Sequence, residues 1–186
     1  MPRKADEQLE GRILDAAYRL WSKGGEEAVT MRAVARAAGT TTPTLYERFQ
    51  DKHDLLAFLQ ERAREKVFQA IKSSASASEA CHRALDFMVR HGNEYRLLIA
   101  HWAARLVRNE RMPSYEFLMT LLAKDLGGPA KEHSELAMAL MATVYGAAAL
   151  LIEGEIEERV SKQFRGACLD ACDELIESAR RKAAVA

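Results

Sequence analysis

The stretch that decides the fold is residues 30–52, TMRAVARAAGTTTPTLYERFQDK. It reads as two short helical segments separated by a tight turn at Gly39, which is the pattern of a helix-turn-helix. Small apolar side chains on the first segment, such as Val34, allow a second helix to cross it closely. Leu45 and Phe49 are four residues apart, and this spacing predicts the buried face of the second helix.

The N-terminal end of that second helix carries the residues expected to read DNA. In a helix-turn-helix the second helix enters the major groove with its N-terminal residues at the base edges. A proline at the first helical position loses no hydrogen bond and favours an extended residue before it, so Thr42 is expected to cap this helix. Threonine hydroxyls bond bases or phosphates, and their methyl groups contact thymine methyls. The residues in question are Thr41, Thr42, Pro43 and Thr44.

The rest of the chain predicts an all-α protein. Its 186 residues are 48% apolar and 29% charged, with only four prolines, which excludes wholesale disorder and favours helix. Apolar periodicity and breakers predict about nine helices, with no alternating strand pattern. We expect a three-helix DNA-binding domain at 1–52 and a helical bundle for effector binding and dimerisation at 53–186.

Charge and composition limit the kinds of partner. The net charge is zero, which makes a generally polycationic nucleic-acid coat improbable. Residues 1–52 carry nine basic and eight acidic side chains, and residues 111–186 carry nine and twelve, so the N-terminal part suits an anionic partner better. The odd cysteine count gives no disulfide framework, and no signal peptide is visible. The uncharged run 136–152 is expected to be a buried helix rather than a membrane span, and the protein is expected in the cytoplasm.

Four motifs, in order, carry a family resemblance. They are ILDAAYRLWSKGG, T-x-R-x-V-A-x-x-A-G, T-P-T-L-Y-x-R-F and D-K-x-D-L, and together they cover residues 13–55. This segment resembles the DNA-binding domain of the tetracycline-repressor-like (TetR) family of transcriptional regulators. The resemblance implies a homodimer that represses transcription and is released from a palindromic operator by a small-molecule effector. The chain departs from the family at Thr40, where an apolar valine is usual, and at Glu47, an acidic residue in the recognition helix.

The resemblance also implies DNA-contacting roles outside the threonine cluster. Thr30 would cap a helix N-terminus that binds a phosphate, and Tyr46 would direct its hydroxyl at another. Lys52 takes the position of the family's phosphate-contacting lysine, and Arg32 and Arg48 would reach the backbone or a groove edge. Taken singly, each has a simpler interpretation: Thr30 as a cap only, Tyr46 as a core residue, and the arginines as solvated charges.

Part of the C-terminal bundle is a candidate effector site. Met88, His91, Tyr95 and Trp102 recur at helical spacing, which suits a mostly apolar pocket and equally an ordinary core. Family resemblance favours the pocket and an effector that is mostly apolar. It adds further lining candidates: Phe68, Phe87, His101, Tyr115 and Met119.

The last two predicted helices carry apolar stripes that one small bundle does not need to bury. A four-helix homodimer interface is the natural use of such stripes. The stripe residues are Leu136, Leu140, Val144, Ala147 and Leu151 on one helix, and Phe164, Cys168, Ala171 and Leu175 on the other.

Two alternative functions are weighed against a regulator. A helical-bundle enzyme would find its best metal motif at Glu79-x-x-His82, but a di-metal site needs two such pairs and the sequence holds one. We therefore expect no metal, no cofactor and no enzymatic activity. The second alternative is an interaction protein whose helix-turn-helix no longer binds DNA, and the retained Tyr46 and Lys52 argue against it.

Overall fold

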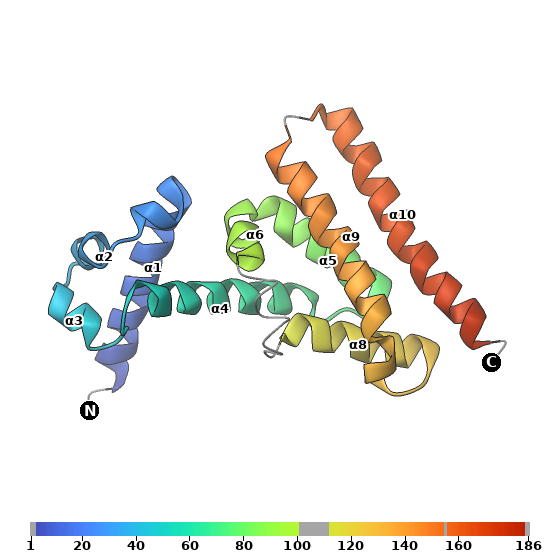
Figure 1. The fold of residues 1–186 in the computed structure, drawn as a ribbon, viewed down its shortest axis with the longest axis horizontal. Helices are drawn as coiled ribbons and strands as arrows, with labels where there is room; N and C mark the ends of the chain where they lie inside the picture. Colours follow the sequence, from blue (N-terminus) through green and yellow to red (C-terminus); the bar gives the residue numbers. More distant parts are fainter. Residues whose placement is uncertain (1–2, 101–111, 155, 185–186) are drawn as a thin grey trace. The chain divides into compact units, whose positions relative to one another are not determined.

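The computed structural model describes residues 3–100, 112–154 and 156–184, and every regular element in these ranges is a helix (Figure 1). The predicted all-α fold is confirmed. The chain forms two compact units, residues 1–63 and 64–186, and the division falls within helix α4, Lys52–Ile71. The functional boundary at residue 52 stays a prediction.

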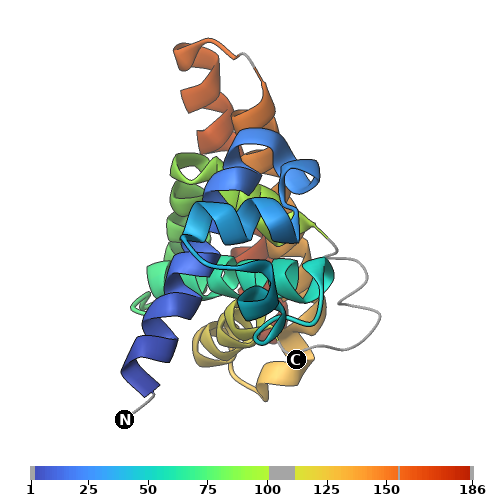
Figure 2. The same cartoon turned by 90° about the vertical axis from the view of Figure 1, so that its left-hand side faces the viewer.

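The first unit contains the helix-turn-helix. It consists of α1 (Arg3–Ala28), α2 (Met31–Ala38), α3 (Thr42–Tyr46) and the first part of α4. Helix α2 packs against α1 and α3, and Figure 2 shows it crossing over α1. The predicted inner residues Val34, Leu45 and Phe49 are fully buried. Helix α1 begins at Arg3, and its regular geometry breaks at Gly24 and Gly25.

The second unit is a helical bundle. After the end of α4 it contains α5 (Ala77–Arg90), α6 (Gly92–Ile99), α8 (Pro113–Leu126), the short 3₁₀ helix η1 (Ala130–His133), α9 (Ser134–Glu153) and α10 (Glu158–Ala183). Helix α9 packs against α5, α8 and α10, and it runs beside α10 in Figure 1. The residues that follow α6, 101–111, lie outside the described residues.

Helix α9 corrects the predicted dimer interface. Its inner face holds Leu140, Val144 and Ala147, which are buried within the protomer's own bundle and cannot meet a second copy. The physical reason is that α9 is apolar on every side, so the periodicity of its sequence does not reveal which side faces inward. Its outer face carries Met138 and Leu150, and the Leu150 side chain is 57% exposed.

The outer apolar face of α9 also corrects the expectation of a buried helix. By length and composition, 130–153 qualifies as a membrane span, but only 28% of its most apolar window is buried within the protomer. The other predicted interface residues are all at least partly accessible. Leu136, Leu151, Phe164 and Cys168 are half-buried, and Ala171 and Leu175 are exposed.

Candidate DNA-binding surface and effector cavity

Local hydrogen bonds and a tight turn at Gly39 fix the two ends of α2. The Thr30 hydroxyl accepts a hydrogen bond from the Ala33 amide at 3.1 Å and so caps α2, as predicted. Gly39 ends α2 in the left-handed conformation, with φ at 67°, which a glycine adopts at no steric cost. The amide groups at the exposed N-terminus of α2 therefore stay ordered beside Thr30.

Helix α3 is capped one residue earlier than predicted. Thr41 is extended, and its hydroxyl accepts a hydrogen bond from the Thr44 amide at 3.3 Å, whereas Thr42 is the first helical residue. Proline fits the second helical position as well as the first, because neither amide has a partner within the helix. The Thr41 and Thr44 hydroxyls lie 2.9 Å apart and hydrogen-bond to each other.

This cap predicts a measurable stability change. Replacing Thr41 by alanine should lower the free energy of unfolding by about 1 kcal/mol, because the Thr44 amide loses its acceptor. Urea unfolding followed by circular dichroism measures the change. Thr41→Ser keeps the hydroxyl and is the control, which should stay close to wild type. An equal loss in both variants would show that the methyl group, and not the cap, matters.

The charged and aromatic candidates of the motif lie on its outer side. Tyr46 is 53% exposed, so it is not a core residue, and Arg32 is exposed as well. The Arg48 guanidinium donates to the Thr44 carbonyl at 3.3 Å and lies 3.8 Å from Glu47, which partly neutralises that carboxylate.

Lys52 begins α4 on the same unit, and its ammonium lies 3.9 Å from the Glu26 carboxylate. This distance makes it a loose surface pair that costs little to exchange for a phosphate. The structure thus leaves each predicted DNA-contacting residue at least partly accessible: Thr30, Arg32, Thr41, Thr42, Pro43, Thr44, Tyr46, Arg48 and Lys52.

With this fold and this exposed surface, the protein is a helix-turn-helix protein. Residues 13–58 match the profile of the family described as bacterial regulatory proteins, tetR family. The match to this family covers the helix-turn-helix part of the chain.

Curated relatives share the N-terminal part. The HTH-type transcriptional repressor KstR of Mycolicibacterium smegmatis is 40% identical over 86 residues, which cover 46% of this chain and 42% of the relative. KstR of Rhodococcus jostii is 46% identical over 63 residues, which cover 34% of this chain and 30% of the relative. The matched segment thus spans less than half of these relatives.

Solved structures share the fold over nearly the whole chain. A TetR-family transcriptional regulator from Streptomyces coelicolor superposes with a TM-score of 0.66 at 19% identity, with 92% of this chain and 99% of that chain covered. A TetR variant from Acinetobacter baumannii, solved in complex with minocycline, gives a TM-score of 0.65 at 18% identity, with 93% of this chain and 97% of that chain covered. At these identities the likeness shows the fold alone.

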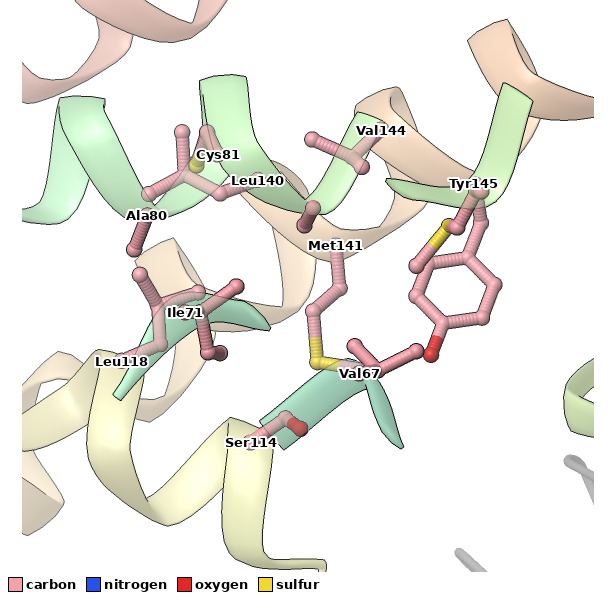
Figure 3. A pocket seen from close by; sticks show the side chains of 12 residues that line it. Val67, Ile71, Ala80, Cys81, Ser114, Leu118, Leu140, Met141, Val144 and Tyr145 are labelled. Carbon is pink, nitrogen blue, oxygen red and sulfur yellow. The ribbon is translucent and has the colours of Figure 1, made fainter. Parts of the chain in front are cut away.

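An apolar cavity lies inside the second unit, where α4, α5, α8 and α9 meet (Figure 3). It consists of two adjoining pockets of about 40 and 30 Å³, which share Val67, Ser114, Met141 and Tyr145. A pocket that holds a drug-sized ligand has roughly 300–1,000 Å³. The cavity in this state therefore has room for a few waters, and a larger guest requires the helices to move apart.

The predicted effector residues are only partly at this cavity. Met88 lines the first pocket and Tyr115 the second. His91 is exposed and stacks on Phe87, with ring centres 4.4 Å apart. Neither Phe68 nor Met119 lines the pockets. Phe68 packs edge-on against Phe117, and Met119 is half-buried. His101 and Trp102 lie outside the described residues.

Tyr145 and Tyr95 place polar groups in and beside this cavity, in addition to Ser114 in its wall. Tyr145 lines both pockets, and Figure 3 shows its hydroxyl at the edge of the open space. Tyr95 is buried behind it and donates a hydrogen bond to the Tyr145 carbonyl at 3.0 Å. The predicted Tyr95 does not line either pocket. Sequence reasoning missed Tyr145, although it is the one aromatic residue in the long apolar run 136–152.

The half-buried Tyr145 phenol predicts a loss of stability at alkaline pH. Burial, and secondarily Tyr95, raises its pKa from 10 to about 12. The unfolded chain then loses this proton first, so the contribution of Tyr145 is complete below pH 10 and disappears as the pH rises through 12. Between pH 9 and 11 the loss is about 1 kcal/mol.

The measurement is urea unfolding of wild type and Tyr145→Phe at pH 9 and 11. The variant should lose less stability over this interval than wild type does. Tyr46→Phe, at an exposed tyrosine, is the matched control and should behave like wild type. An equal loss of stability between pH 9 and 11 in wild type and Tyr145→Phe would contradict the raised pKa of Tyr145.

Proposed function

We propose that the protein is a cytoplasmic transcriptional repressor that binds an inverted-repeat DNA operator as a dimer and responds to a small-molecule effector. The observation that carries the proposal is the helix-turn-helix, in which Leu45 and Phe49 close the inner face while Tyr46 and the N-terminus of α3 face solvent. Relatives that match this segment are named transcriptional repressors.

The outer side of the motif offers separate groups for phosphates and for bases. Lys52 and the Tyr46 hydroxyl suit phosphates, as does Thr30 at the N-terminus of α2, where backbone amides and the helix dipole favour an anion. Thr42 and Thr44, which lie at the start of α3, are proposed as the base readers. In this arrangement the first group sets affinity and the second sets sequence preference.

The experiment that tests DNA binding starts with selection of a site from random duplexes by the purified protein. Lys52→Ala should then weaken binding to the selected and to random duplexes alike, and lower the salt slope by about one unit, because one phosphate contact is lost. Lys23→Ala, at an exposed lysine of α1, is the matched control and should keep the wild-type slope.

The outcomes separate the proposal from its rivals. Selection of an inverted repeat supports a dimeric regulator, whereas recovery of random sequence supports an interaction protein with a non-functional helix-turn-helix. A Lys52→Ala variant with the slope of Lys23→Ala would contradict the phosphate role. Among the residues the structure describes, no group of three metal-ligating side chains comes together.

The dimer is proposed to form through the outer faces of α9 and α10. Met138 and Leu150 on α9 and Leu175 on α10 are large apolar side chains exposed in the protomer. Gly146, which lies between Met138 and Leu150 on α9, is also exposed. A side chain placed there would meet nothing within 4 Å, so the position permits close approach of a second helix. A second copy covers the apolar surface that the protomer leaves open.

The effector is proposed to enter the cavity between α4, α5, α8 and α9. The walls are almost entirely apolar, so a mostly apolar molecule with one polar group near Tyr145 or Ser114 fits them best. Because the cavity is small, the effector selects a more open state of the bundle. A change in the α4 direction then alters the spacing of two recognition helices, which must match half-sites about 34–36 Å apart.

A further inference from the structure

The wall of the cavity carries a single sign of charge. Arg64 on α4 lines the second pocket, and the Nη1 atom of its guanidinium is buried. Among the described residues that line the two pockets, none is an aspartate, a glutamate or a lysine. The charge that a guest meets in this part of the wall is therefore positive, and the surrounding side chains are mostly apolar.

Helix α4 connects this charge to the apolar end of the cavity. Arg64, Val67 and Ile71 are spaced by three and four residues, so they lie on one face of the helix. Arg64 lines the second pocket, Val67 lines both, and Ile71 lines the first. At 1.5 Å per residue, the stripe from Arg64 to Ile71 is about 10 Å long. The cavity thus has a charged end and an apolar end.

The N-terminus of α8 lies at the charged end. Pro113, Ser114 and Tyr115 form its first turn and line the second pocket together with Arg64. No side chain caps this helix, and the amides of a first turn have no partner within their helix. These amides and the helix dipole favour an anion, as the guanidinium does. Ser114 adds a hydroxyl, which Figure 3 shows at the edge of the open space.

The opposite end of the cavity suits a hydrocarbon chain. Figure 3 shows Ile71, Ala80 and Leu118 together, on the side away from Tyr145. No charged residue occurs among the described residues of this first pocket. Burial of a hydrocarbon tail against these side chains is favourable, since it removes apolar surface from water.

Building on the proposed function, we infer that the effector is a carboxylate with an apolar tail, whose head group pairs with Arg64 and whose tail lies along Ile71. A guanidinium binds a carboxylate through two parallel N–H···O bonds, and the low dielectric of an apolar wall strengthens them. The same guanidinium repels an ammonium group and gains less from a neutral hydroxyl. Arginine binds phosphate as well, but a carboxylate is smaller and suits a cavity of this size.

Three probes with the same eight-carbon tail test the head group. At pH 7 octanoate is an anion, octan-1-ol is neutral and octylamine is a cation. Isothermal titration calorimetry with the full-length protein should show the tightest binding for octanoate, weaker binding for octan-1-ol and none for octylamine. Arg64→Gln should weaken octanoate binding about 10- to 100-fold, because the charge-assisted pair is lost, and change octan-1-ol binding by less than about twofold.

Two further variants are controls for the head and the tail. Arg62→Gln removes an arginine of the same helix whose guanidinium lies 2.6 Å from the Asp15 carboxylate and does not line the cavity, and it should bind octanoate like wild type. Ala84→Leu fills part of the first pocket and should weaken octanoate and octan-1-ol alike. Circular dichroism establishes that each variant is folded.

The wild-type protein alone decides the outcome if Arg64→Gln does not fold. Equal binding of octanoate and octan-1-ol by wild type overturns the carboxylate site, as does failure of octanoate to bind. Both results leave operator binding by the helix-turn-helix in place, because selection of a duplex measures it separately. If octanoate binds through Arg64 and the affinity for the selected duplex is unchanged, the carboxylate site stands and the effector part of the proposed function is contradicted.

Discussion

Leu175→Glu should turn the proposed dimer into a folded monomer. Leu175 is 38% exposed on α10 of the protomer, so a glutamate there is hydrated when the protein is monomeric and loses its water only when a second copy covers it. A buried, unpaired charge costs roughly 3–5 kcal/mol, which corresponds to a rise of about two to four decades in the dimer dissociation constant. Leu150→Glu, on the outer face of α9, should have the same effect.

Sedimentation velocity and circular dichroism together make this test selective. Ile99→Glu is the matched control, because Ile99 is also an exposed apolar residue of the second unit but lies on α6. It should remain a dimer. Leu140→Glu should fail to fold, because Leu140 is fully buried in the protomer. Dimeric Leu150→Glu and Leu175→Glu would place the interface elsewhere, and recovery of the wild type in the membrane fraction would assign the face of α9 to lipid.

The N-terminal motif was predictable because each of its signals is local. The 30–38 segment carries its own cap and its own terminating glycine, and the spacing of Leu45 and Phe49 leaves one possible inner face. The cap of α3 was displaced by one residue, because a proline is equally acceptable at the first two helical positions. This error assigns the capping hydroxyl to the wrong threonine, but the predicted packing of the motif is the same.

The cavity and the outer face of α9 depend on tertiary packing, and the sequence predicted them less well. Apolar residues occupy all sides of α9, so Leu140 and Leu150 are indistinguishable until α5 and α10 cover one side. The prediction for His91 assumed that one helical spacing continues from α5 into α6. The break at Gly92 interrupts that spacing, so His91 is exposed. Tyr145 enters the site only because four helices converge there.

Lys66→Met should destabilise the second unit by about 2–3 kcal/mol. The Lys66 ammonium donates to the Glu94 carboxylate at 2.6 Å, and Glu94 is almost completely buried on α6. Removing one partner of a buried ion pair costs about 3–5 kcal/mol, and the partial exposure of Lys66 reduces this value. Lys72→Met, at an exposed lysine just beyond α4, is the matched control and should unfold like wild type.

A double-mutant cycle separates the pair from the burial of either side chain. Lys66→Met with Glu94→Leu should recover most of the stability, because an apolar pair leaves no charge without its partner. If Lys66→Met unfolds at the same urea concentration as Lys72→Met, the ion pair contributes nothing. The pair joins α4 to α6, and the next residue, Tyr95, is bonded to the Tyr145 backbone at the cavity. Under the proposed function the double variant should therefore fold and still respond less to an effector, since this polar connection between the cavity and α4 is lost.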